Sequence, residues 1–336
     1  MTDSFRDETV VDPGRLPEEL GVEPGLRPAS LREFIGQDDL RANLAVFLES
    51  ARRRGKSLDH VLLTGPPGLG KTTLAHIIAA EMSASIRVTS GPAIDRAGDL
   101  AAILSHVETG DVLFIDEIHR MNRSISEVLF PAMEDFSLDL MIGQGPGARS
   151  VRIDLPPFTL IGATTRAGLL AAPLRDRFGI VERLDYYPTR HLCEIALRAA
   201  ERLHVEIDSD ATEELSRRAR GTPRVAIRLL RRIVDFAVVE HHERIDLPTT
   251  RSALDRLGVD LLGLDRLSRR YLQIVLVNHG GGPVGLGTLA ATLGEEPDTI
   301  EETCEPFLLQ IGLLERTARG RALTLKGREY ASSLAE

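Results

Sequence analysis

The sequence predicts an α/β domain with a parallel sheet, followed by a small all-helical domain and a C-terminal winged-helix domain. Three observations lead to this prediction. In the first half of the chain, short apolar runs alternate with helical stretches, which is typical of crossover units in a parallel sheet. After Tyr187-Pro188 the pattern becomes helical. Near the C-terminus, helices are followed by two short extended arms around Arg319-Gly320, as in a winged helix.

The first domain is expected to follow a mobile leader, residues 1–25, which is acidic and rich in Pro and Gly. From Asp38 onward, apolar residues recur on one helical face as far as Gly55, which is expected to end the helix. Further apolar runs predict four strands, and the stretches between them predict helices. The strands are expected at 60–64, 86–89, 112–115 and 158–163, with helices such as 72–82 and 100–107 between them.

Residues 138–155 interrupt this alternation. Their centre, from Gly143 to Gly147, joins two extended arms and predicts a protruding hairpin. The small domain should then contain four helices and the winged-helix unit three. These are expected near 189–204, 210–220, 224–241 and 248–257, and then at 268–278, near Leu286 and at 297–310. The predicted domains therefore span 26–185, 186–257 and 258–336.

The composition excludes several classes of protein. The 336 residues carry 50 acids and 41 bases, a net charge of −9, so the chain is not a uniformly basic nucleic-acid coat. Cys193 and Cys304 lack Cys-x-x-Cys spacing, which excludes a disulfide scaffold or a cysteine zinc site and suits a reducing cytosol. The N-terminus resembles no secretory signal, and the uncharged stretch 271–294 contains Pro and six Gly. We therefore expect a cytoplasmic protein with no membrane partner.

Residues 65–72, GPPGLGKT, match the P-loop pattern G-x-x-x-x-G-K-[ST]. They follow an apolar strand and open a helical stretch, which is the context that the motif requires. Gly65, Gly68 and Gly70 allow backbone N–H groups to turn toward phosphate oxygens at the positive end of a helix. Lys71, one of only three lysines in the chain, is predicted to bind the β- and γ-phosphates of ATP. Thr72 is predicted to bind Mg²⁺.

Two carboxylates follow the apolar strand VLFI, 45 residues after Lys71. Alone, two acids at the end of a strand are more often a solvated corner. Following a P-loop, they favour hydrolysis, with Asp116 binding Mg²⁺ through water and Glu117 activating the attacking water. The neighbouring His119 could suggest a metal ligand, but no second ligand stands at helical spacing.

Further side chains could act on the γ-phosphate. Thr164 and Thr165 end the next strand with hydroxyl groups. Arg177 could neutralise charge on the phosphate of a neighbouring subunit, which would make the enzyme active only as a ring. The alternative interpretation of this arginine is a surface salt bridge. Arg224 begins a helix of the second domain, where it could report the nucleotide state.

The C-terminal segment 313–328 carries five basic residues and a single acid, Glu315. Arg316 and Arg321 flank the predicted wing, and Arg319 lies at its turn. A solvated charged face is the alternative to DNA binding. Contacts from such a cluster to phosphates would position DNA without reading its sequence.

Taken in order, these motifs resemble those of the AAA+ ATPases. Within that class, FIDEIHR, GATTRAGLL, PLRDRFG, the hairpin after MEDF and the terminal RTARGR are similar to the RuvB family of bacterial Holliday-junction branch-migration motors. The resemblance covers about residues 26–330. The ordered set comprises Arg27-Pro28, Phe34-Ile35-Gly36-Gln37, the P-loop, Asp116-Glu117, Thr164-Thr165, Arg177 and Gly221-Thr222-Pro223-Arg224.

The resemblance implies a hexameric motor that hydrolyses ATP to ADP with Mg²⁺ and moves a four-way junction along duplex DNA in recombination and repair. It implies that the junction-recognition protein RuvA docks on the hairpin at about 138–155, and that the resolvase RuvC joins the larger complex. Arg177 matches the arginine finger of the family, Arg224 the second sensor, and Arg316 and Arg321 its DNA contacts.

The resemblance also implies the remaining nucleotide-binding residues. For the first sensor, Thr165 is preferred, although the family class usually has Asn there and Thr164 remains open. The other residues expected at or near the nucleotide pocket are Leu26, Arg27, Thr73, Glu134, Asp135, Phe136 and Tyr187.

Two other functions are compatible with parts of this pattern. A clamp loader or replication initiator shares the ATPase core but usually lacks this hairpin and the terminal wing together. A nucleotide-dependent DNA-binding regulator would hydrolyse little ATP, and the presence of Glu117 and Arg177 argues against it. DNA-stimulated ATP turnover would separate the motor from the regulator.

Overall fold

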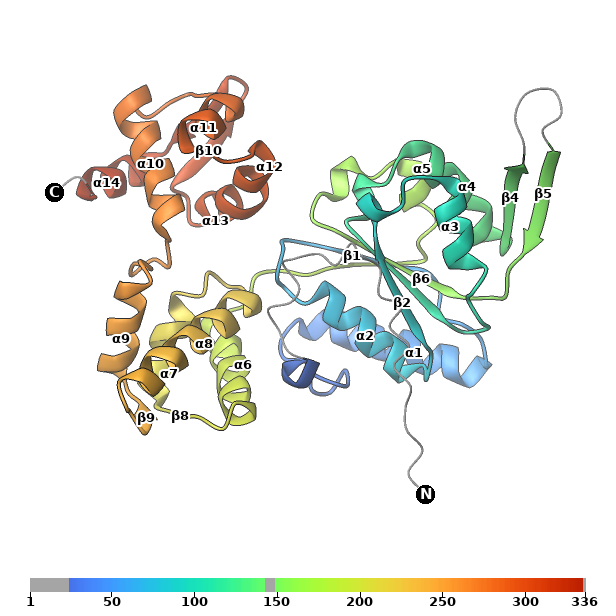
Figure 1. Ribbon diagram of the computed structural model, residues 1–336, viewed down its shortest axis with the longest axis horizontal. Coiled ribbons are helices and arrows are strands. Elements are labelled where there is room, and N and C mark those ends of the chain that lie inside the picture. Colours follow the sequence, from blue (N-terminus) through green and yellow to red (C-terminus); the bar gives the residue numbers. More distant parts are fainter. Residues whose placement is uncertain (1–23, 143–148, 335–336) are drawn as a thin grey trace.

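The computed structural model describes residues 24–142 and 149–334, and its first domain is built on a five-stranded parallel sheet (Figure 1). The expected leader lies almost entirely outside the described residues. The strand order is β2-β3-β6-β1-β7. The strands are β1 (Val61–Thr64), β2 (Ile86–Ser90), β3 (Val112–Asp116), β6 (Thr159–Thr164) and β7 (Ile180–Arg183). The four expected strands are confirmed; β7 was not predicted, because a short edge strand with two charged residues carries little hydrophobic signal.

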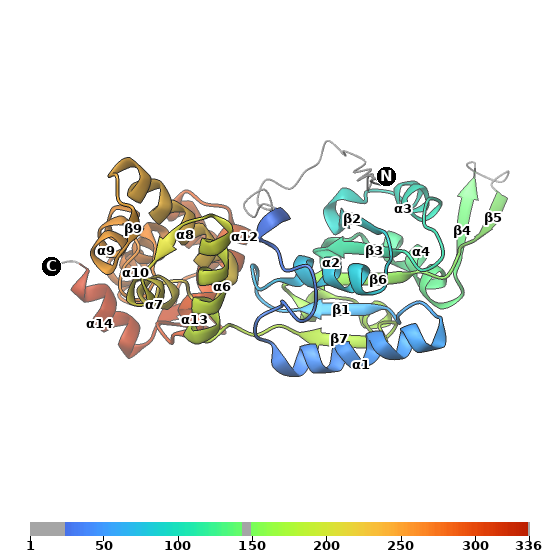
Figure 2. The same ribbon diagram turned by 90° about the horizontal axis from the view of Figure 1, so that it is seen from below.

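Helices cover both faces of this sheet, as Figure 2 shows for α1 and α3. Successive residues of β1 point to opposite faces, so Val61 and Leu63 pack in one core cluster and Leu62 in another. The first cluster includes side chains of α1 and α2, and the second includes side chains of α3 and α4. These helices are α1 (Asp38–Arg54), α2 (Lys71–Glu81), α3 (Ala97–Leu104) and α4 (Arg123–Glu134), with a short α5 (Ala172–Arg175). The predicted end of α1 is confirmed, since Gly55 adopts a left-handed conformation with φ of 59°.

The expected hairpin is confirmed as an antiparallel pair, β4 (Ser137–Ile142) and β5 (Arg149–Asp154), which projects from the sheet domain in Figure 1. Its register places Ser137 opposite Asp154 and Ile142 opposite Arg149. The turn predicted at 143–147 lies outside the described residues.

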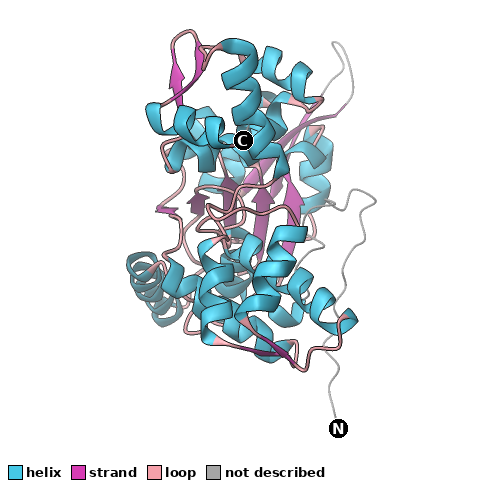
Figure 3. Ribbon diagram, turned by 90° about the vertical axis from the view of Figure 1, so that its left-hand side faces the viewer, coloured by secondary structure: helices cyan, strands magenta, loops and turns pink. Residues whose placement is uncertain are grey.

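The small domain contains the four predicted helices, and Figure 3 shows that helices dominate this side of the molecule. They are α6 (Thr189–Arg202), α7 (Ser209–Arg217), α8 (Pro223–Val239) and α9 (Leu247–Arg256). The description as all-helical needs one correction: β8 (Glu206–Ile207) and β9 (Arg244–Ile245) form a two-residue parallel pair. Pairs this short leave no periodic signal in a sequence.

The third domain is a winged helix with its own apolar core. Its elements are α10 (Arg266–His279), α11 (Leu286–Leu293), α12 (Pro297–Thr299), α13 (Glu305–Gln310), β10 (Leu314–Thr317), β11 (Gly320–Leu323) and α14 (Leu325–Ser333). The helix expected at 297–310 is interrupted by a π-helical turn, Ile300–Cys304, and α14 was not predicted. The uncharged stretch 271–294 divides between α10 and α11. Within the described part of the chain, no helix combines the length and apolar character needed to cross a membrane.

Candidate nucleotide site and DNA-binding surface

The P-loop lies at the carboxyl end of β1 and leads directly into α2. Gly65, Gly68 and Gly70 have φ angles of 137°, 77° and 106°, which residues with a side chain rarely adopt. A Cβ on Gly65 would lie 2.4 Å from the carbonyl oxygen of Leu184. The Lys71 side chain is buried and its ammonium donates to the carbonyl oxygens of residues 65 and 66, at 2.8 and 2.9 Å. The sequence therefore folds into a narrow backbone cradle with a cation at its base.

The small domain closes over this cradle. The backbone N–H of Arg224, at the start of α8, donates to the carbonyl oxygen of Gly68 over 3.3 Å. The phenol of Tyr187 donates to the carbonyl oxygen of Leu69 over 3.2 Å, and burial raises the pKa of Tyr187, which keeps the phenol protonated. Arg224 and Tyr187 therefore both contact the P-loop.

Leu26 and Arg27, which are predicted to lie at the nucleotide pocket, pack against the sheet domain and the small domain. Leu26 is buried in the core cluster shared with α1 and α2. The carbonyl oxygen of Arg27 accepts a hydrogen bond from Arg202 of α6 over 3.0 Å. Since α6 belongs to the small domain, this segment links the two domains beside the site.

Asp116 and Glu117 lie at the same edge of the sheet as the P-loop, the edge formed by the carboxyl ends of the strands. The reason is that β3 runs parallel to β6, and β6 runs parallel to β1. The Asp116 carboxylate accepts the backbone N–H of Glu117 over 2.9 Å. Glu117 has a φ of 47°, a left-handed conformation that is uncommon without glycine and concentrates at functional sites. Its carboxylate pairs with Arg120 at 3.0 Å. The motifs do not indicate this role for Arg120, although its spacing of three residues from Glu117 is a signal for such a pair.

The two threonines at the end of β6 have different environments. The Thr164 hydroxyl accepts the backbone N–H of Arg166 over 3.0 Å and lies 2.9 Å from Nδ1 of His119. The hydroxyl oxygen of Thr165 is also buried, yet it has no hydrogen-bond partner among the described residues. A buried hydroxyl without a partner is costly unless a ligand or water satisfies it. The arrangement leaves Thr165 available to a ligand, whereas Thr164 is already engaged.

Arg177 lies at the opposite edge of the sheet, the one formed by the amino ends of the strands. Residues 178 and 179 lead from it to Ile180, whose N–H bonds to the carbonyl oxygen of His60, just before β1. The P-loop begins after β1, whose four residues separate these edges by roughly 10 Å. The guanidinium of Arg177 pairs with Glu134 at 3.2 Å and lies over the Phe130 ring at 4.3 Å. Arg177 therefore does not reach the P-loop of its own chain.

Glu134, Asp135 and Phe136, which the resemblance placed close to a nucleotide pocket, do not lie beside the P-loop of their own chain. The carbonyl oxygen of the preceding Met133 contacts Nε2 of His60 at 3.0 Å, and the Phe136 ring packs against His60 with centroids 6.3 Å apart. These contacts put all three residues at the Arg177 edge of the sheet. The physical reason is that α4 runs back along the sheet before entering the hairpin.

In the winged helix, Arg316 and Arg321 face each other across β10 and β11. Both bind Glu305, whose side chain is fully buried: Arg316 Nη2 lies 2.7 Å and Arg321 Nε 2.8 Å from its oxygens. The Tyr271 hydroxyl donates to the same carboxylate over 3.1 Å. Only 15% of the Arg321 side chain is exposed, whereas Arg316 keeps 44%. Arg319 is exposed at the turn of the wing and forms no ion pair with any described residue.

Models of three RuvB domains match the chain in succession. The Holliday junction DNA helicase RuvB P-loop domain matches residues 26–184, the RuvB AAA lid domain 187–260 and the RuvB C-terminal winged helix domain 261–332. The chain belongs to the RuvB family.

Solved structures of RuvB from Thermotoga maritima are similar over nearly their whole length. The structure described as the Holliday junction branch migration motor is 51% identical with a TM-score of 0.85, covering 92% of this chain and 98% of the other. A lysine-to-arginine variant of the same protein is 50% identical with a TM-score of 0.85, covering 91% and 98%. As a RuvB-family chain, this protein is a P-loop ATPase and a DNA-binding motor of Holliday-junction branch migration.

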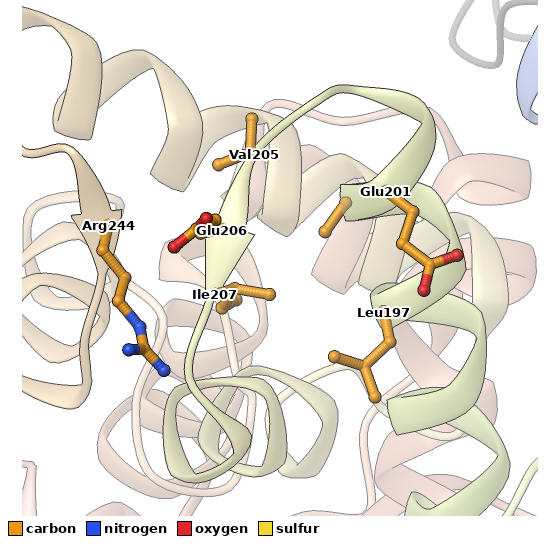
Figure 4. A pocket seen from close by; sticks show the side chains of 7 residues that line it. Leu197, Glu201, Val205, Glu206, Ile207 and Arg244 are labelled. Carbon is orange, nitrogen blue, oxygen red and sulfur yellow. The ribbon is translucent and has the colours of Figure 1, made fainter.

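A separate surface pocket on the RuvB lid lies away from this machinery (Figure 4). It has a volume of about 340 Å³ and lies between α6 and the β8–β9 pair. Figure 4 shows the side chain of Leu197 on α6 across the pocket from Ile207 on β8, while the carboxylate of Glu201 points away from Ile207. None of its lining residues belongs to the P-loop, the acidic pair or the sensor threonines. This pocket is therefore separate from the residues that are predicted to bind the nucleotide.

Proposed function

We propose that this RuvB-family chain works as a homohexameric ring that drives duplex arms of a Holliday junction by ATP hydrolysis in recombination and repair. The observation that carries the proposal is the position of Arg177 at the sheet edge opposite the P-loop, where it cannot serve its own nucleotide. A ring brings this edge of one subunit to the P-loop of the next. Glu134, Asp135 and Phe136 share the edge, so we assign them to the pocket of the neighbouring subunit together with Arg177.

We assign roles around the phosphates from the chemistry of the side chains. Lys71 would hold the β- and γ-phosphates, while the backbone at Gly65, Gly68 and Gly70 surrounds their oxygens. The Thr72 hydroxyl and the Asp116 carboxylate are hard oxygen ligands of the kind that Mg²⁺ prefers, so they fit this ion. Mg²⁺ bound there would offset negative charge on the phosphates.

Hydrolysis requires a base and a sensor at the same place. Glu117 would orient the attacking water and accept its proton, after its carboxylate leaves Arg120. Thr165 would satisfy its buried hydroxyl by binding the γ-phosphate or that water. Solved variants of the Thermotoga protein replace a lysine, an alanine, a threonine, an arginine and a proline. Their spacings along that chain match those of Lys71, Ala163, Thr165, Arg177 and Pro223. The match supports Thr165, rather than Thr164, as the first sensor.

The remaining nucleotide contacts would come from the lid and its neighbours. Leu26, Arg27 and Tyr187 would surround the adenine, and Thr73 would follow Thr72 at the start of α2. Arg224 would report the γ-phosphate to the lid, because its backbone already contacts Gly68. Loss of the γ-phosphate could then change the angle between the lid and the sheet domain.

We further propose the partners of this motor. Arg316 and Arg319, the more exposed arginines of the wing, would contact DNA phosphates, while Arg321 mainly supports the wing. The hairpin at 138–155 would bind RuvA, and RuvC would join the complex in the cytoplasm. The side chains of the apolar segment 140–142, which favours such a role, lie outside the described part.

A four-way-junction assay tests the proposal. The chain is mixed with RuvA, ATP and a labelled junction, and release of duplex arms is followed together with ATP turnover. Glu117→Gln should bind ATP without unwinding, and Lys71→Ala should lose tight ATP binding. Native mass spectrometry of the protein bound to DNA should detect a complex that contains six copies of the chain. ATP turnover without any junction unwinding would contradict the motor function, and a stable active monomer would contradict the ring.

A further inference from the structure

Arg166 joins the sensor end of β6 to the winged-helix domain. Its backbone N–H donates to the Thr164 hydroxyl, and it directly follows Thr165 in the chain. Its Nη2 lies 2.9 Å from Oε2 of Glu301 and 3.1 Å from Oε1 of Glu302, with Asp298 at 3.6 Å. Figures 1 and 2 show α12, which begins this acidic segment, on the side of the winged helix that faces the sheet domain.

These contacts are held by charge rather than by directional hydrogen bonds. The Nη2 atom of Arg166 is buried and makes no hydrogen bond of suitable geometry within the described part of the chain. The side chains of Arg166, Glu301 and Glu302 are between 21% and 25% exposed, so water screens their attraction only partly. A guanidinium held by three carboxylates can change partners without losing all of its compensation.

The Glu301 carboxylate also contacts the wing, formed by β10 and β11. Its Oε2 faces Arg166, while its Oε1 lies 3.1 Å from Arg321 and 3.5 Å from Arg316. The Glu301 side chain therefore lies between Arg166, which follows β6, and the two wing arginines Arg316 and Arg321. A DNA phosphate that attracts Arg316 would change the charge balance that Glu301 shares with Arg166.

The charge of Glu117, the proposed catalytic base, also acts on Glu302 of the winged helix. Burial raises the pKa of the Glu302 carboxyl, Arg166 lowers it, and the negative charges of Glu117 and Asp298 raise it further. Glu302 of the winged helix is therefore within electrostatic range of Glu117. Burial lowers the pKa of His119, and the nearby charges that act on it include those of Glu117, Arg166 and Asp298, so the acidic segment lies on the same side of the site as these residues.

We propose that Arg166 is a positioning residue that couples DNA bound at the wing to ATP hydrolysis, through Glu301 and Glu302. DNA phosphates draw Arg316 away from Glu301, Glu301 then binds Arg166 more strongly, and the end of β6 with Thr165 shifts relative to the γ-phosphate. The inference rests on the proposed DNA contacts of the wing. It requires no new chemistry, because only ion pairs are exchanged.

Steady-state ATPase measurements on the full chain, with and without duplex DNA, test the coupling. Arg166→Ala should reduce the stimulation of kcat by DNA at least fivefold, while the KM for ATP and the affinity for duplex DNA stay within about twofold of wild type. Arg166→Lys keeps one positive charge and should recover part of the stimulation. Arg123→Ala is the matched control, since Arg123 forms a 3.2 Å ion pair with Glu127 on α4 and both side chains are exposed. It should retain full stimulation.

A double-mutant cycle identifies the contact itself. Glu302→Ala should also reduce the stimulation, and the double variant with Arg166→Ala should be no worse than Arg166→Ala alone, because both changes remove one interaction. Independent losses that multiply would overturn the contact. Wild-type stimulation in Arg166→Ala would overturn the coupling, and so would an equal loss of DNA affinity, which would explain the missing stimulation by itself.

A measurement without DNA separates this inference from the proposed DNA interface. Amide hydrogen exchange of residues 297–304 should become faster in Arg166→Ala, but not in Arg123→Ala, because the segment loses its contact with the sheet domain. Unchanged exchange would overturn the contact whatever the DNA results. If exchange responds as expected while Arg316→Ala and Arg319→Ala bind DNA like wild type, the DNA interface is wrong and the coupling step with it.

Discussion

The Arg321 guanidinium lies 2.8 Å from the Glu305 carboxylate, and the Glu305 side chain is fully buried in the winged helix. A buried carboxylate needs its cation, so Arg321 belongs to the folded structure of the wing before it can serve DNA. The sequence alone placed Arg316, Arg319 and Arg321 in one basic cluster with one role. The structure separates them, because Arg319 forms no ion pair with the residues described.

We predict that Arg321→Ala destabilises the winged helix by about 3 kcal/mol, because it leaves the Glu305 charge with incomplete compensation. Calorimetry of the full chain should detect a lowered unfolding transition. Arg319→Ala should leave that transition in place, weaken duplex binding equally on unrelated sequences and reduce the salt dependence by about one counterion. A wing that tolerates Arg321→Ala without any change in unfolding would contradict the structural role of Arg321.

The two neighbouring threonines should separate in their effects. Thr165→Val removes a hydroxyl that has no described partner, so we expect folding to be preserved and kcat to fall by about 10²-fold, with Thr165→Ser as the control that keeps the hydroxyl. Thr164→Val removes the acceptor of the Arg166 N–H and should cost about 1–3 kcal/mol of stability. Turnover and urea unfolding are measured for each variant. The opposite pattern would identify Thr164 as the sensor.

Action of Arg177 on a neighbouring subunit can be tested by mixing variants. Arg177→Ala should keep nucleotide binding and lower ATP turnover by roughly 10³-fold or more, the usual scale for an arginine finger. Glu117→Gln should also be inactive. Mixed rings contain sites that combine an intact Glu117 with an intact Arg177, so turnover should partly recover. Mixed assembly without recovery, verified by mass spectrometry, would count against this arrangement.

His60 should contribute a pH dependence to stability. Its Nδ1 accepts the Leu160 N–H over 2.9 Å, which leaves Nε2 to donate to the Met133 carbonyl oxygen, so the folded protein holds the ring neutral. Burial lowers the pKa of His60 below its unfolded value of about 6.5. The unfolded state therefore binds the proton first, and stability falls as pH drops through 6.5 toward the folded pKa.

Urea unfolding between pH 7.5 and 5.5 measures this effect. The wild-type chain should lose up to about 1.4 kcal/mol per pH unit more than His60→Gln, which cannot take up a proton. His241→Gln, a change at an exposed histidine, should behave like the wild type. Identical pH profiles for wild type and His60→Gln would show that the ring does not titrate as proposed.

Much of the fold could be predicted from sequence because its signals are local. The alternation of apolar runs with helical stretches predicted the parallel sheet, and the change of pattern after Pro188 predicted the lid. GPPGLGKT predicted the phosphate cradle, since glycine and lysine are needed there whatever surrounds them. The edge strand β7 and the short β8–β9 pair were missed because each pairs with a strand far away in the chain. The π-helical turn at Ile300–Cys304 was missed because one widened turn within a helical stretch leaves little periodic signal.

By itself, the sequence determined the α/β ATPase core, the order of the three domains, and the pairing of the P-loop with Asp116 and Glu117. Only the tertiary structure decided which partners the individual side chains of the site have. It engaged Thr164 and left the Thr165 hydroxyl without a partner, and it carried Arg177 to the sheet edge opposite the P-loop. The physical reason is that hydrogen bonds and ion pairs depend on distances between elements, which a pattern along one chain does not specify.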